Sequence, residues 1–221
     1  MNRRKAEERS LKQRLVEAAY DMMQEDGAEQ IHVRTLAQRV GCSSTVLYKH
    51  FDNFNYLIAL ASVRILEPYI RELEINLASS GTDLVQSELN AWRLFNKYAF
   101  RNPYAYLNLF WGHSARELEE IFSEYLSMYP VFVQDKNMAF FYTSIFSGSI
   151  EERDYVWFRR AASEGLMDYD DARPVSQINC LIAHGLLTLH IADYQKPGVY
   201  EEAVALCNKL IEHNIRIHLK K

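Results

Sequence analysis

A short stretch between residues 31 and 51 carries side chains suited to contact a polyanion. It contains Arg34, Arg39 and Lys49 and no acidic residue. Tyr48 and His50 end in polar groups that can donate hydrogen bonds to phosphate oxygens, which would fix the register of a protein on DNA without reading its sequence. Three basic residues are equally well explained as a short solvated face, and Tyr48 as a half-buried packing residue. Composition alone therefore leaves both interpretations open.

The spacing of apolar residues predicts three helices that would position these side chains. Apolar residues recur with helical periodicity from about residue 8 to 25, and Gly27 follows as a cap. A second periodic segment ends at Gly41, and Ser43 has the position and side chain of an N-cap for a third short helix. Two helices joined by a tight turn that contains glycine are typical of a helix-turn-helix, whose second helix can enter the major groove.

In this arrangement the polar residues fall into two groups. Ser44, Thr45 and Lys49 would occupy the exposed face of the third helix, from which such side chains reach base edges. Arg34 and Thr35 open the second helix, where the helix dipole favours a phosphate. Simple solvation is the alternative for Arg34.

The stretch LKQRLVEAAYDMMQEDGAEQIHVRTLAQRVGCSSTVLYKHFDNFNYL resembles the N-terminal domain of the tetracycline-repressor (TetR) family of bacterial regulators. The matching features are Leu15, Ala18, Ala19, Gly27, Leu36, Ala37, Gly41, Ser43 and the motif Leu47-Tyr48-x-His50-Phe51 followed by Leu57. The resemblance assigns Tyr48 and His50 to the phosphate backbone of double-stranded DNA. It also implies an effector-binding and dimerisation domain behind the helix-turn-helix.

Two positions depart from the family pattern. Phe54 stands where the family usually has a lysine that contacts phosphate, and Val46 replaces the usual threonine. A neutral aromatic side chain cannot release a counterion, so one phosphate contact per half-site is expected to be missing. DNA binding would then be weaker, or would depend more on a basic N-terminal arm of Arg3, Arg4, Lys5, Arg9 and Arg14.

Aromatic residues gather in the middle of the chain. Residues 95–146 hold 15 of them, against 13 in the other 169 positions. Aromatic rings supply rigid apolar area to ligand pockets, and tyrosine adds a polar tip. The residues proposed to frame an effector pocket are Tyr98, Tyr106, Phe110, Trp111, Tyr125, Phe141 and Tyr142. Alternatively, any one of these residues could simply be a buried core residue that contacts no ligand.

The last two predicted helices, about 174–193 and 199–219, have the pattern of a dimer interface. The first carries an apolar stripe of Ile178, Leu181, Ile182, Gly185, Leu186 and Leu189. The second is apolar on two faces, one with Leu210 and Ile217 and the other with Val204, Ile211 and Ile215. A helix that is apolar on two sides needs two partners, its own domain and a second subunit. Val204, Ile211 and Ile215 are the residues of this helix that we expect at the dimer interface. The sequence therefore predicts a four-helix homodimer interface, which would present two recognition helices to a palindromic operator.

Other signals exclude several classes of protein. Three widely spaced cysteines, Cys42, Cys180 and Cys207, favour a reducing compartment. No 18-residue apolar run or signal peptide is present, which predicts a cytoplasmic protein with no membrane partner. The histidine spacings suit no metal site, and no phosphate-binding glycine loop, HExxH or GxSxG motif occurs. We therefore expect no enzyme activity, cofactor or metal.

These observations predict an all-α protein with a helix-turn-helix domain at residues 1–53 and an effector-binding and dimerisation domain at residues 54–221. The expected function is a transcriptional regulator, a repressor that a small apolar or aromatic effector releases from DNA. The effector would act by moving a long helix predicted at residues 54–79. The alternative is a helical dimer of this type that acts mainly through protein–protein contacts and binds DNA weakly, and a small-molecule-binding or catalytic helical bundle ranks last.

Overall fold

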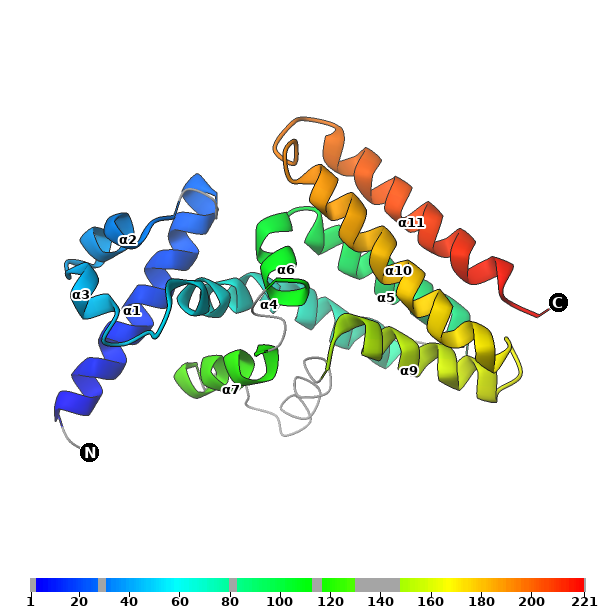
Figure 1. Cartoon of the computed structure of the whole chain (residues 1–221), viewed down its shortest axis with the longest axis horizontal. Coiled ribbons are helices and arrows are strands. Elements are labelled where there is room, and N and C mark those ends of the chain that lie inside the picture. The colour runs from blue at the N-terminus through cyan, green and yellow to red at the C-terminus, as the bar shows by residue number, and fades with distance from the viewer. Residues whose placement is uncertain (1–2, 28–30, 80–82, 113–116, 130–147, 221) are drawn as a thin grey trace. The chain divides into compact units, whose positions relative to one another are not determined.

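A computed structural model describes residues 3–27, 31–79, 83–112, 117–129 and 148–220 (Figure 1). Within these ranges the chain is helical. The helices are α1 (Arg3–Asp26), α2 (Val33–Val40), α3 (Ser44–Leu47), α4 (Phe54–Ser79), α5 (Leu84–Ala99), α6 (Pro103–Phe110), α7 (Leu118–Met128), α9 (Ile150–Ser163), α10 (Tyr169–His190) and α11 (Val199–Ile217). The predicted all-α class is confirmed, as is the long helix at residues 54–79. None of the described helices is long and apolar enough to cross a membrane.

The chain divides into two compact units. Unit 1 holds the described residues of 1–65 and 108–146, and unit 2 holds those of 66–107 and 147–221. The sequence of α4 runs from the first unit into the second, and α6 does the reverse. The domain boundary expected at residues 53 and 54 stays a prediction.

The core of unit 1 holds the short helices in place. Leu15 and Ala19 of α1 are fully buried, as are Leu36 of α2 and Leu47 of α3. The turn after α2 depends on Gly41, whose φ of +76° is left-handed. The Gly41 amide donates to the Gln38 carbonyl and the Cys42 amide to the Ala37 carbonyl, which is the Schellman pattern of a helix end. Ser43 Oγ then accepts from the Val46 amide at 3.3 Å and starts α3 as predicted.

Four helices of unit 2 pack into one layered bundle. α10 lies between α9 and α11, α11 also contacts α5, and α5 contacts α9. Ala183 and Leu187 of α10 and Ile211 and Ile215 of α11 are buried at these contacts. α10 begins at Tyr169, five residues before Pro174, whereas the sequence predicted a start at about 174. The proline lies inside the helix rather than at its first turn.

Candidate nucleic-acid interface and ligand-domain sites

The polar residues predicted to meet DNA lie at the surface around α3. Thr45, Tyr48 and Lys49 are exposed, with Tyr48 at 50%, while Ser44 and His50 are half-buried. The helix itself ends at Leu47, and residues 48–50 continue in turns in which the Lys49 amide donates to Val46 and the His50 amide to Leu47. Leu47 and Phe51, both buried, hold the two ends of this segment against the core. The turn thus directs consecutive polar side chains away from the protein.

The basic side chains of this region differ in their hydrogen bonds and ion pairs within the protein. Arg39 makes a two-pronged ion pair with Glu25, with both nitrogen–oxygen distances at 2.7 Å. Arg14 donates to the Val40 carbonyl at 2.8 Å and so satisfies the end of α2. Arg34 and Lys49, in contrast, are exposed and pair with no residue that the structure describes. They are the cations of this stretch that remain available to a phosphate or a base edge.

Thr35 has a local role that the sequence analysis did not anticipate. Its hydroxyl donates to the His32 carbonyl at 2.8 Å and accepts from the His32 amide at 3.2 Å. These two bonds close the first turn of α2. A phosphate contact through the Thr35 hydroxyl would have to replace the bond to the carbonyl.

The start of α4 shows what stands at the family's lysine position. Asn53 caps the helix by accepting from the Tyr56 amide at 2.7 Å. Phe54 follows as the first helical residue and is half-buried. No positive charge is present at this position, so a DNA phosphate near the start of α4 would find no cationic side chain there.

The predicted pocket residues are distributed over both units. Tyr98 and Tyr106 belong to unit 2, Phe110, Trp111 and Tyr125 belong to unit 1, and Phe141 and Tyr142 lie outside the described residues. In unit 2 the ring of Tyr69 lies 6.0 Å from that of Tyr98 and 6.1 Å from that of Tyr106, both edge-on. Tyr69 was missed because it lies outside the aromatic-rich segment at residues 95–146.

Tyr98 and Tyr106 have different surroundings. The Tyr98 hydroxyl donates to Glu72 at 2.7 Å, and Lys97 holds the same carboxylate. Burial and this hydrogen bond raise the pKa of Tyr98 to about 12. Tyr106 is fully buried, and burial raises its pKa well above the usual value. Both phenols are therefore neutral at physiological pH and present apolar rings with a polar tip.

In unit 1, helix α7 contacts α1 and α4 through polar side chains. The Tyr56 hydroxyl donates to Glu124 at 2.5 Å, and Lys12 of α1 pairs with the same carboxylate. Gln13 of α1 also donates to the Met128 carbonyl at 2.6 Å. Tyr125, one of the predicted pocket residues, is buried next to Glu124. The same short helix thus carries a candidate effector residue and contacts to α1 and α4.

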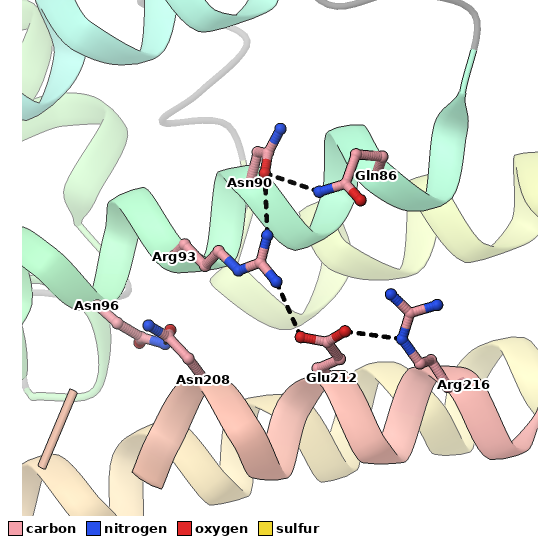
Figure 2. A network of polar contacts seen from close by, with 7 residues as sticks. All are labelled: Gln86, Asn90, Arg93, Asn96, Asn208, Glu212 and Arg216. Atoms are coloured by element: carbon pink, nitrogen blue, oxygen red, sulfur yellow. Dashed lines mark hydrogen bonds and ion pairs between the residues drawn. The ribbon is translucent and has the colours of Figure 1, made fainter. Parts of the chain in front are cut away.

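A groove of about 640 Å³ in unit 2 is lined by residues of α11 and by Arg93 of α5. Figure 2 shows the polar network of Arg93, in which Arg93 donates to Glu212 at 2.8 Å and Arg216 to the same carboxylate at 2.7 Å. Nearby, the Asn96 amide donates to Asn208 at 2.8 Å. The groove is open to solvent, where ion pairs contribute little stability. The residues of this network follow no recognisable sequence motif and could not be predicted to lie together.

Helices α10 and α11 both expose large apolar side chains, which together are called the apolar surface here. Its large exposed members are Ile178, Leu181 and Leu189 on α10 and Leu206, Leu210 and Ile217 on α11. A Cβ added at Gly185 would meet no atom within 4 Å, so this glycine also faces open space. Ile182, Leu186 and Val204 are half-buried at the margin.

Two residues predicted for the dimer interface lie elsewhere. Ile211 and Ile215 are each only 1% exposed, because they pack into the core of their own unit. The exposed apolar face of α11 is the one with Leu206, Leu210 and Ile217.

Comparisons with known proteins identify the fold. No family model and no curated protein matches the sequence. Among solved structures, RolR in complex with resorcinol shares 11% identity, covers 98% of both chains and has a TM-score of 0.57. A protein of unknown function from Rhodococcus sp. RHA1 shares 17% identity over 92% of this chain and 94% of its own, with a TM-score of 0.52. The TetR-family transcriptional regulator PfmR from Thermus thermophilus shares 18% identity over 90% of this chain and 97% of its own, with a TM-score of 0.49.

The sequence motif and the observed helices agree. The motif around Tyr48, His50 and Phe51 lies on a helix-turn-helix, and a larger all-helical region follows it in the chain. This chain therefore has the all-α fold of RolR and of the Rhodococcus protein, and the likeness to the TetR family seen in the sequence agrees with this fold.

Proposed function

We propose that this protein is a homodimeric transcriptional repressor that a small-molecule effector releases from a palindromic operator. The observation that carries the proposal is the exposed polar surface of the helix-turn-helix. Thr45, Tyr48 and Lys49 project from a segment anchored by Leu47 and Phe51, and Arg34 and Lys49 are free of intramolecular partners among the described residues. Such an array of hydrogen-bond donors and unpaired cations suits phosphates and base edges.

Dimerisation is supported by the apolar surface of α10 and α11. Six large apolar side chains there are more than a third exposed, which is unusual for a surface in permanent contact with water. Two antiparallel pairs of helices related by a twofold axis would cover this surface with a second copy of itself. The dimer would carry two helix-turn-helix units and so match two half-sites.

An apolar or aromatic effector fits the tyrosine and phenylalanine side chains gathered around Tyr69. RolR, which shares the fold, was crystallised with resorcinol, a small aromatic ligand. α7 offers a route from such a ligand to DNA, because Glu124 binds both Lys12 of α1 and Tyr56 of α4. A ligand that prefers one position of α7 would shift the helix-turn-helix only by as much as its affinity differs between the two positions.

The proposal is tested by fluorescence anisotropy with palindromic fragments taken from upstream of the protein's own gene. Measurements at two salt concentrations should show nanomolar binding that weakens steeply as salt rises, because phosphate contacts release counterions. A scrambled duplex of the same composition is the control. Equal, weak binding to both duplexes at low salt would refute sequence-specific regulation.

The alternative is a helical dimer that acts through protein contacts and binds DNA weakly. It is favoured by one observation, the half-buried Phe54 and Val46 at positions where the family has a lysine and a threonine. Weak DNA binding with a stable dimer would support this alternative. The cytoplasmic location, the lack of enzyme activity and the absence of a cofactor remain predictions.

A further inference from the structure

Two carboxyl groups, Glu88 of α5 and Asp154 of α9, lie together in the core of unit 2. Their side chains are only 6% and 4% exposed, and Trp92, one turn after Glu88 on α5, donates to Asp154, which brings the two carboxyl groups together. The two groups interact directly, and each shifts the pKa of the other. Two ionised carboxylates cannot hydrogen-bond, since neither has a proton to donate. Their contact in an apolar interior requires that the pair hold a proton.

The partners of each group indicate where the proton resides. Asp154 accepts from the indole Nε1 of Trp92 at 2.7 Å and from the Asn179 amide at 3.3 Å. Glu88 Oε2, in contrast, is buried with no hydrogen-bond partner among the described residues. Donors stabilise a carboxylate, and burial without donors stabilises the neutral acid. Asp154 is therefore the carboxylate, and Glu88 is the acid that donates to it.

The pair belongs to a chain of buried hydrogen bonds that joins four helices. Asn179 of α10, which donates to Asp154, accepts from the Asn214 amide of α11 at 2.9 Å. Asn214 also donates to the Val175 carbonyl at 3.1 Å. Glu88 and Trp92 join α5 to this network through Asp154. These are the helices that pack into the bundle and carry its apolar outer surface.

The charged and titratable groups around the pair come from α4, α9 and α10. Tyr69 of α4 interacts electrostatically with Glu88, and Cys180 of α10 interacts with both carboxyl groups. Arg153 and Glu151 of α9 act on the same Cys180, and burial raises the pKa of its thiol. α11 contributes only the uncharged Asn214 among the described contacts to this network. Burial is the largest cause that raises the pKa of Glu88, followed by the charge of Asp154. Burial also raises the pKa of Asp154, to about 6, against the lowering effect of its donors.

We propose that Glu88 and Asp154 share one proton, and that this proton makes the packing of the α5–α9–α10–α11 bundle responsive to pH. Loss of the proton would leave two negative charges side by side in an apolar interior. The folded bundle therefore holds a proton near neutral pH that the unfolded chain, with ordinary carboxyl groups, has released. The stabilisation by this proton is complete below the unfolded pKa and is lost as the pH rises through the folded pKa.

The test is chemical denaturation of the full chain between pH 5 and 8.5, for the wild type and for Glu88→Gln. Glutamine is neutral at every pH and can donate to Asp154 in place of the protonated acid. The ratio of the wild-type to the variant unfolding constant should rise by up to about tenfold per pH unit over this range, since one proton is released. Glu202→Gln, at an exposed position of α11, is the matched control and should run parallel to the wild type. Parallel profiles for the wild type and Glu88→Gln would overturn the proposal.

A second measurement does not depend on the variant folding well. The infrared spectrum of wild-type protein at pH 7 should contain the C=O stretching band of a protonated carboxylic acid, shifted by isotopic labelling of glutamate but not of aspartate. The band should vanish in Glu88→Gln. A wild-type spectrum without this band at pH 7 would refute the shared proton, whatever the denaturation data show.

Discussion

The helix-turn-helix and the last two helices expose side chains of opposite chemistry. Around α3 the exposed residues are Thr45, Tyr48 and Lys49, which end in hydrogen-bond donors or a positive charge. Along α10 and α11 they are leucines and isoleucines, with Leu181 at 68% and Leu189 at 76% exposure. An exposed donor is satisfied by water until a phosphate or base replaces it, whereas an exposed leucine gains free energy only when water is removed. The two surfaces therefore predict two different partners, DNA for the first and a second copy of the chain for the second.

The largest expected effect comes from placing charge on the apolar surface. Leu181→Glu/Leu189→Glu should raise the dimer dissociation constant by at least about 10³-fold, since each leucine buried at an interface contributes about 1.5–3 kcal/mol. Sedimentation velocity at several concentrations measures this change. The control is Val156→Glu, because Val156 of α9 is 60% exposed but lies outside this surface. A double variant that stays dimeric would assign the interface to another part of the molecule.

The corresponding change at the other surface is Tyr48→Ala/Lys49→Ala. We expect operator affinity to fall by about 10²-fold, because each half-site loses hydrogen bonds to charged groups. The salt dependence should also become shallower, by a slope of about 2 for the two copies of Lys49. Anisotropy titrations over a salt series measure both quantities. Arg159→Ala, an exposed cation of α9, should leave them unchanged; equal losses in both variants would indicate nonspecific attraction.

A backbone substitution separates the positioning of α3 from its chemistry. Gly41→Ala should destabilise the helix-turn-helix by about 1 kcal/mol, because an L-residue in a left-handed conformation is strained. A methyl group there would meet no atom within 4 Å, so the strain acts alone. Thermal unfolding followed by circular dichroism measures the loss. Unchanged stability would mean that the turn after α2 can adopt another conformation.

The smallest expected effect is at the solvent-open network of Figure 2. Hydrogen bonds from Arg216 and Arg93 lower the pKa of Glu212, so its stabilisation is present at neutral pH and is lost as the pH falls through the folded pKa. Glu212→Gln should therefore be slightly less stable than the wild type at pH 7, with no difference in strong acid or high salt. Denaturation curves at low and high pH test this. A variant with the same pH trend as Glu88→Gln would contradict the opposite signs assigned to these two glutamates.

The sequence predicted those features that depend on local spacing. The helix-turn-helix followed from apolar periodicity, Gly41 and Ser43, because caps and glycines act on their immediate neighbours. The start of α10 was predicted at about residue 174, whereas the helix begins at Tyr169 and contains Pro174. In the folded chain Asp171 and Arg173, from the first turns of the helix, pair with His218 and Glu152. Ile211 and Ile215 could not be assigned to the inner face of α11, since both faces are apolar and only packing distinguishes them.

Features that depend on contacts between residues far apart in the chain could not be predicted from the sequence. The buried contact between Glu88 and Asp154 joins residues of two helices, and a lone glutamate in a helix gives no sign that it is buried. The position of Tyr69 beside Tyr98 and Tyr106 is of the same kind. The role of Arg14 was also unpredictable, because its guanidinium donates to the carbonyl of Val40, which lies on another helix.

The most direct test of the two-surface account is the composition of the protein–DNA complex. Sedimentation velocity with a labelled palindromic duplex from upstream of the gene gives the number of chains bound at saturation. We expect two chains per duplex for the wild type, loss of this complex for Leu181→Glu/Leu189→Glu, and a complex about 10²-fold weaker for Tyr48→Ala/Lys49→Ala. A single bound chain, or a two-chain complex that both pairs of substitutions leave at wild-type affinity, would contradict the assignment of the two surfaces.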